Sequence, residues 1–181
     1  TDEAVRTLDP NVKMNPPLRS DADRVALLDA LRDGTIECVA TDHAPHARHE
    51  KEVPFEAAPF GVTGLETAFA ALYTHLVEPG LLPLATLLER MSAGPARVFG
   101  LERPRVAAGA RANLVLLDLG RRWTVESFRS KSRNSWLLGE TLTGAVAMTI
   151  AGGAVVHHAR RLDGARPGAE AAASPAPERG E

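Results

Sequence analysis

The residues best suited to chemistry form one run, Thr41-Asp42-His43-Ala44-Pro45-His46, directly after the apolar segment 36–40. A carboxylate such as Asp42 can bind a metal ion or move a proton. His46 lies four residues further on, across a proline-stiffened turn, and can return to the same pocket to bind an anionic substrate. Histidines in a solvated polar loop are the simpler interpretation. The segment follows a predicted buried strand, and α/β barrels place catalytic groups at that position. This favours a functional interpretation of the segment.

Two further segments could contact a ligand. In Lys13–Arg19 (KMNPPLR), Asn15 offers amide donors and an acceptor that suit the edge of a cyclic amide. A plain Asn-Pro-Pro turn explains that segment equally well. Ala58–Thr67 (APFGVTGLET) combines glycines, which let the backbone approach a ligand, with a predicted helix start, which supplies free N–H groups for an anion. Taken alone, this third segment is better explained as a loop-to-helix junction.

The elements that must position these segments alternate between strand and helix with short connections, which is typical of parallel α/β structure. Prolines close the first strand, a capping pair opens the first helix, and a nearly continuous apolar run predicts a second strand buried on both faces. The predicted elements are a strand at 10–15, a helix between Ser20 and Gly34, a strand at 36–40, and helices at 63–77, 84–91 and 95–99.

From Gly100 onwards the pattern becomes β-rich. Residues 113–118 predict a strand, and residues 145–156 predict a hairpin about Gly152-Gly153. The last stretch, 162–181, is rich in Ala, Pro, Gly and Glu without apolar periodicity and predicts a disordered tail. The expected units are therefore an α/β part at 1–100, a small β-rich domain at 101–161 and the tail.

Composition limits the classes of function. The chain carries 21 basic and 23 acidic residues, so its charge argues against nucleic-acid and anionic-membrane partners. No apolar run approaches the roughly 20 residues needed to cross a bilayer. The single Cys38 rules out an internal disulfide and fits a reducing compartment, which predicts a cytoplasmic protein. The start, Thr1-Asp2-Glu3, is no natural initiation site, so we expect a fragment.

Together these segments resemble the dihydroorotase family of the amidohydrolase superfamily. The resemblance rests on KMNPPLR, TDHAPH, APFGVTGLET and Ser130–Asn134 (SKSRN), in that order, and covers roughly residues 1–160. Gly109–Asp118 and Thr149–Val156 resemble the β-domain that accompanies the superfamily's barrel. The implied fold is the carboxy-terminal part of a (β/α)8 TIM-type metallo-hydrolase barrel, with its last two βα units at 1–100, plus part of that small β-rich domain.

The resemblance also implies roles for individual residues. Asp42 matches an aspartate that is both a metal ligand and the general acid/base, taking a proton from metal-bound water and passing it to the leaving amide nitrogen. Asn15 and His46 match positions that bind dihydroorotate, and Phe60 and Gly61 match a backbone contact to it. The implied reaction is the reversible hydrolysis of dihydroorotate to N-carbamoyl-aspartate in pyrimidine biosynthesis, with one or two zinc ions as cofactor.

One departure from the family pattern bears on activity. The family's His-x-His pair and its other metal ligands have no counterpart in this sequence, so we expect the chain alone to be inactive. Alternative functions are a related allantoinase or hydantoinase and a non-catalytic scaffold for aspartate transcarbamoylase. A free-standing β-domain binding module fits least, because the matching segments lie outside the β region. A homodimer is a family-level expectation.

Overall fold

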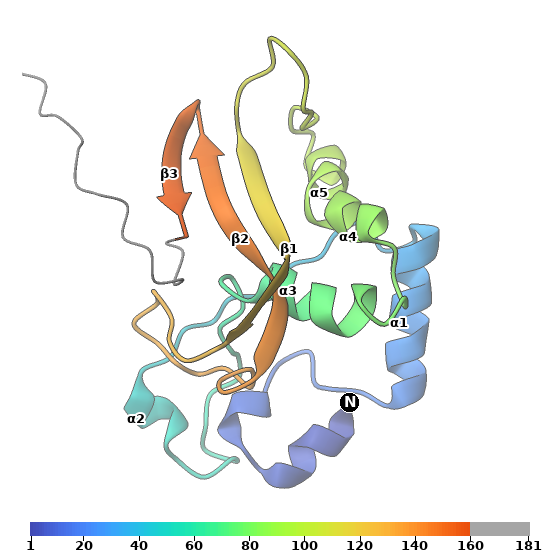
Figure 1. Ribbon diagram of the computed structural model, residues 1–181. Coiled ribbons are helices and arrows are strands. Elements are labelled where there is room, and N and C mark those ends of the chain that lie inside the picture. Colours follow the sequence, from blue (N-terminus) through green and yellow to red (C-terminus); the bar gives the residue numbers. More distant parts are fainter. Residues whose placement is uncertain (160–181) are drawn as a thin grey trace, which may run out of the picture.

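The computed structural model describes residues 1–159, in which the helices α1, α3, α4 and α5 lie on one side of a three-stranded antiparallel sheet (Figure 1). The helix α3 lies between the sheet and the outer helices α1 and α4. The helical elements are η1 (Asp2–Thr7), η2 (Pro10–Val12), α1 (Asp21–Asp33), α2 (Arg48–Lys51), α3 (Ala68–Leu72), the π-helical turn η3 (Tyr73–Val77), α4 (Leu84–Met91) and α5 (Ala93–Val98).

Helix α1 begins and ends where its local sequence predicts. The Ser20 hydroxyl accepts a hydrogen bond from the Asp23 backbone N–H at 3.3 Å, and the Asp23 carboxylate accepts one from the Ser20 N–H at 3.1 Å. This reciprocal pair satisfies two of the N–H groups that a helix start leaves free. Gly34 ends the helix with a φ of +93°, a left-handed conformation that glycine adopts without steric cost.

The sheet consists of β1 (Leu114–Thr124), β2 (Thr141–Ala151) and β3 (Ala154–His158), paired in that order. β2 and β3 form the predicted hairpin, with Gly152 and Gly153 both at positive φ in the turn. β1 runs antiparallel to β2 from Leu114 opposite Ile150 to Thr124 opposite Thr141. The strand predicted at 113–118 is therefore confirmed and extends further.

Three predicted elements differ from the structure. Residues 10–12 form a 3-10 turn instead of a strand, and residues 36–40 form no strand. The segment 36–40 is extended but only half-buried, and its Val39 N–H donates to the carbonyl of Arg90, at the end of α4, instead of to a neighbouring strand. A strand buried on both faces needs neighbours on each side, and the described residues supply none here. The helix predicted from residue 63 begins only at Ala68.

Two apolar clusters hold the described chain together. One joins α3 to the sheet through Ala70, Val125, Leu137 and Leu142, and the other joins α1 to α4 through Leu28, Leu82 and Leu87. Phe69 packs against the second cluster, so α3 contributes to both. Within residues 1–159 there is no helix with the length and apolar character of a membrane span. The predicted tail, 162–181, lies outside the described residues, and the domain division at residue 100 stays a prediction.

Candidate active site

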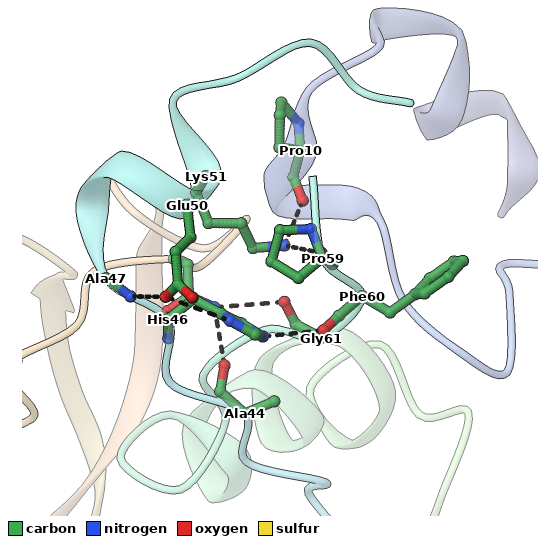
Figure 2. A network of polar contacts seen from close by, with 10 residues as sticks. Pro10, Ala44, His46, Ala47, Glu50, Lys51, Pro59, Phe60 and Gly61 are labelled. Atoms are coloured by element: carbon green, nitrogen blue, oxygen red, sulfur yellow. Dashed lines mark hydrogen bonds and ion pairs between the residues drawn. The ribbon is translucent and has the colours of Figure 1, made fainter. Parts of the chain in front are cut away.

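His46 and the Phe60-Gly61 pair lie together (Figure 2). The His46 Nε2 lies 2.9 Å from the carbonyl oxygen of Phe60, which can only accept, so Nε2 carries the hydrogen in this arrangement. The other ring nitrogen, Nδ1, lies 3.7 Å from the Glu50 carboxylate. The Phe60 side chain points away from this network and is exposed. A substrate that binds through His46 Nε2 therefore has to replace the Phe60 bond.

Asn134 joins the two loops that carry these residues. Its side chain is buried, its Oδ1 accepts from the His46 N–H at 3.1 Å, and its Nδ2 donates to the carbonyls of Ala44 and Gly61 at 2.9 and 3.3 Å. Its own carbonyl accepts from the Thr63 N–H at 2.9 Å. One amide thus satisfies three backbone groups, one buried and two half-buried, from segments that are remote in the sequence.

Asn134→Asp is expected to lower the free energy of unfolding by about 2–4 kcal/mol, because a carboxylate leaves two carbonyls without donors and adds a buried charge. Urea unfolding of the 181-residue chain measures this change. Asn113→Asp is the matched control: Asn113 is exposed and its Oδ1 only accepts, from the Gly152 N–H at 2.7 Å. We expect that control to stay within about 0.5 kcal/mol of the unmodified chain. Equal losses in both variants would contradict the assigned role of Asn134.

Gly61 lies in close contact with the neighbouring loop. Its φ is +108°, and a Cβ built on it would lie 2.5 Å from the Ala44 Cβ and 3.6 Å from His46 Nε2. Its N–H donates to the carbonyl of Lys13 at 2.9 Å, which connects it to the segment that carries Asn15. Only glycine fits here, because a side chain would meet both a steric clash and an unfavourable backbone conformation.

The N–H groups of Gly64 and Leu65 both donate to His43 Nδ1, at 3.1 and 3.3 Å, and α3 begins only at Ala68. These two N–H groups are therefore not available to an anion, and anion binding at the start of α3 stays a prediction. His43 has a structural role, holding the 64–65 turn against the loop that follows residue 40.

Two lysines lie beside the His46 loop. Lys51 is buried, and its Nζ donates to the carbonyls of Pro10 and Pro59 at 2.8 and 2.9 Å (Figure 2). Burial and then the charge of Lys13 lower the pKa of Lys51 below its ordinary value, while the Asp9 carboxylate acts to raise it. The Lys13 Nζ donates to the carbonyls of Phe55 and Glu56 at 2.7 and 3.0 Å.

Asp42 and Asn15 are exposed, and within residues 1–159 no hydrogen bond or ion pair involves either side chain. Asp42 has a left-handed φ of +43°, which aspartate tolerates better than most residues. The described part of the chain contains no group of three or more His, Cys, Asp or Glu residues able to hold a metal ion. Residues 1–159 therefore do not by themselves fit a zinc ion, which normally needs three or four protein ligands.

The sequence interpretation gave no role to three residues that connect the site. Asn134 and Glu66 lie inside the SKSRN and APFGVTGLET segments, and Lys51 lies outside all the motif segments. The Glu66 carboxylate accepts from the N–H groups of Arg129 and Ser130 at 2.8 and 2.9 Å and so anchors the segment that carries Asn134. Asn134 and Glu66 could have been singled out because they lie in motif segments. Nothing in the sequence pointed to Lys51.

The chain is similar in sequence to proteins named dihydroorotase. The chain is 48% identical to the dihydroorotase of Elusimicrobium minutum (strain Pei191) over 155 residues, which are 84% of this chain and 36% of that protein. It is 48% identical to the dihydroorotase of Bacillus caldolyticus over 157 residues, 86% of this chain and 37% of that protein. The chain thus spans little more than a third of the length of these relatives.

A solved structure and a family model extend the comparison. The L-hydantoinase (dihydropyrimidinase) from Arthrobacter aurescens superposes with a TM-score of 0.80 at 32% identity, over 87% of this chain and 37% of that one. The model of the amidohydrolase family matches residues 9–156, which include the His46 loop, Gly61, Asn134 and most of the sheet. This match shows that the chain belongs to the amidohydrolase family.

Proposed function

We propose that this chain forms the carboxy-terminal part of a dihydroorotase, which reversibly hydrolyses the cyclic amide of dihydroorotate to N-carbamoyl-aspartate. The observation that carries the proposal is the 48% identity to two proteins named dihydroorotase over 155 and 157 residues. Asp42 and His46, which the resemblance assigns to chemistry and substrate binding, are both present in this chain.

The proposed architecture is the last two βα units of a (β/α)8 barrel followed by a small β-domain. The half-buried segment 36–40 supports this, because it is mostly apolar yet lies beside no strand within residues 1–159. In a protein of the relatives' length, further barrel strands would pair with this segment and bury it. Asp42 would then stand at the carboxyl end of a barrel strand, where such barrels place their active sites.

In the proposed hydrolysis, Asp42 moves one proton and other groups of this chain bind the dihydroorotate ring. Water adds to the ring carbonyl carbon, the bond from that carbon to the ring nitrogen breaks, and Asp42 carries the proton from the water to the leaving nitrogen. His46, Asn15 and the backbone of Phe60 and Gly61 bind dihydroorotate. The bond from His46 Nε2 to Phe60 shows that this imidazole can donate to an oxygen from its present position.

The chain by itself is expected to hold no zinc and to show no dihydroorotase turnover. Asp42 would supply one ligand, and the described residues contain no group of three or more His, Cys, Asp or Glu that could hold a metal ion. Equilibrium dialysis of the purified 181-residue chain against zinc, followed by metal analysis, measures the stoichiometry. One tightly bound zinc per chain, or hydrolysis at an ordinary enzymatic rate of about 1 s⁻¹ or more, would contradict this expectation.

The activity is tested in a chimera in which the aligned residues of this chain replace the matching 157-residue stretch of the Bacillus caldolyticus dihydroorotase. We expect the chimera to hydrolyse dihydroorotate with a kcat/KM at least about 100-fold above its values for hydantoin and allantoin, because a site built for one ring rejects others that leave its polar groups unpaired. A chimera that folds and binds metal but does not turn over dihydroorotate would rule out the proposal.

A hydantoinase activity is the second candidate. The TM-score of 0.80 with the L-hydantoinase from Arthrobacter aurescens favours it, since that structure shares this backbone arrangement at 32% identity. The 48% identity to proteins named dihydroorotase is the higher of the two, and for this reason dihydroorotate is the preferred substrate. Faster turnover of hydantoin than of dihydroorotate by the same chimera would reverse this order.

A further inference from the structure

Lys13 and Lys51 connect two segments in opposite directions. The first, 9–15, carries Asn15, and the second, 46–60, begins at His46 and ends at Phe60. Lys51, from the second segment, donates to the carbonyl of Pro10 in the first. Lys13, from the first, donates to the carbonyls of Phe55 and Glu56 in the second. Each segment thus supplies the ammonium group that binds carbonyls of the other, and we name this pair the lysine clamp.

The surroundings of the clamp show how closely the two segments are held. Lys51 has only 7% of its surface exposed, which is unusual for a lysine, and the Pro59 carbonyl takes a second hydrogen bond from it at 2.9 Å. The Lys13 Nζ also lies 5.2 and 4.9 Å from the ring centres of Phe55 and Phe60, within the range of a cation–π contact. The Gly61 N–H completes the connection by donating to the Lys13 carbonyl.

We propose that Lys51 and Lys13 are positioning residues, which hold the His46–Phe60 loop against the Asn15 segment so that the substrate-binding groups are assembled before the substrate arrives. The identity of the substrate rests on the proposed function, whereas the mechanical role of the clamp rests on the contacts alone. Neither lysine needs to touch the substrate. Each ammonium group donates two hydrogen bonds to backbone carbonyls, and the groups proposed to bind the ring belong to other residues.

Loss of the clamp has a distinct kinetic consequence. Without the ammonium groups the loop is open part of the time. The apparent affinity for substrate then falls in proportion to the fraction of molecules whose loop is closed and able to bind. Saturating substrate draws the loop closed again, so the rate of the bound complex changes little. We therefore expect KM to rise about 10-fold and kcat to change by less than about 2-fold. A residue that only stabilised the fold would not separate KM from kcat in this way.

The first experiment uses the full 181-residue chain and measures amide hydrogen exchange in Lys51→Met, which keeps the apolar stem and removes the ammonium group. Exchange in residues 46–60 is expected to become about 10-fold faster, with strands β1 to β3 unchanged. Lys13→Met tests the other half of the clamp and keeps the test informative if Lys51→Met does not fold. Arg24→Met is the control, because Arg24 is exposed on α1 and its side chain pairs with Asp21, outside both segments.

The second experiment measures KM and kcat for the same variants in the chimera, with whichever cyclic amide the unsubstituted chimera turns over. A raised KM with a preserved kcat in both clamp variants, with KM and kcat both unchanged in Arg24→Met, supports the proposal. Unchanged exchange of residues 46–60 in both clamp variants overturns it, as does a fall in kcat without a rise in KM. A chimera that hydrolyses hydantoin but not dihydroorotate would rule out dihydroorotate as the substrate. The lysine clamp is then tested by the hydrogen exchange of residues 46–60 and by KM for hydantoin.

Discussion

Asp42→Asn in the chimera is expected to lower kcat for dihydroorotate by about 10³-fold, because an amide can neither take up the proton from water nor deliver it to the leaving nitrogen. The backbone should tolerate the change. Asp42 is exposed and has a φ of +43°, a left-handed conformation in which asparagine is as acceptable as aspartate. Steady-state kinetics give the change in kcat, and thermal unfolding followed by circular dichroism shows whether the fold is kept.

Asp29→Asn provides the matched control for this loss. The Asp29 carboxylate pairs with Arg32 at 2.7 Å on the exposed face of α1, where such a pair contributes little to stability. We expect this variant to keep kcat within about 2-fold of the unsubstituted chimera. If Asp42→Asn unfolds at the same temperature as the unsubstituted chimera and lowers kcat by less than about 10-fold, Asp42 is excluded as the proton carrier.

Gly61→Ala is expected to lower the free energy of unfolding of the 181-residue chain by about 3–5 kcal/mol. The added Cβ would lie 2.5 Å from that of Ala44, closer than real Cβ contacts allow, so one of the two loops must move. The positive φ of +108° adds the cost of holding alanine in a conformation it disfavours. Because the displaced backbone carries the Phe60 carbonyl, the bond to His46 should weaken as well. Urea unfolding measures the stability.

Two variants separate the clash from the backbone strain. Gly80→Ala places alanine at a φ of +75° with nothing within 4 Å of the new Cβ, so it should cost only about 1 kcal/mol. Adding Ala44→Gly to Gly61→Ala removes the opposing Cβ. The double variant should therefore lose only about as much free energy of unfolding as Gly80→Ala does. If Gly61→Ala costs no more than Gly80→Ala, then the two loops are not in the close contact that the structure shows.

Much of the local structure follows from short stretches of sequence. The Ser20 and Asp23 caps and the Gly34 stop define α1, and Gly152-Gly153 defines the hairpin turn between β2 and β3. These features could be predicted because the interacting groups lie within a few residues of one another, so the local sequence contains both partners. The motif segments likewise indicated where His46, Phe60 and Gly61 would lie, and the structure brings these three together.

Other features depend on partners far away in the chain. Residues 36–40 have the composition of a buried strand, but a strand forms only beside another, and the described chain offers Val39 the end of α4 instead. Gly64 and Leu65 precede α3, and their N–H groups bind His43, a partner 21 and 22 residues earlier in the chain.

The connections that organise the candidate site are also tertiary. Asn134 reaches groups 73 to 90 residues earlier, and Lys51 reaches Pro10 across 41 residues. The sequence by itself thus determined the local elements and the identity of the candidate residues. Tertiary structure alone decided which side chains hold them in place, because a buried amide or ammonium group finds its carbonyl acceptors only after remote segments have packed together.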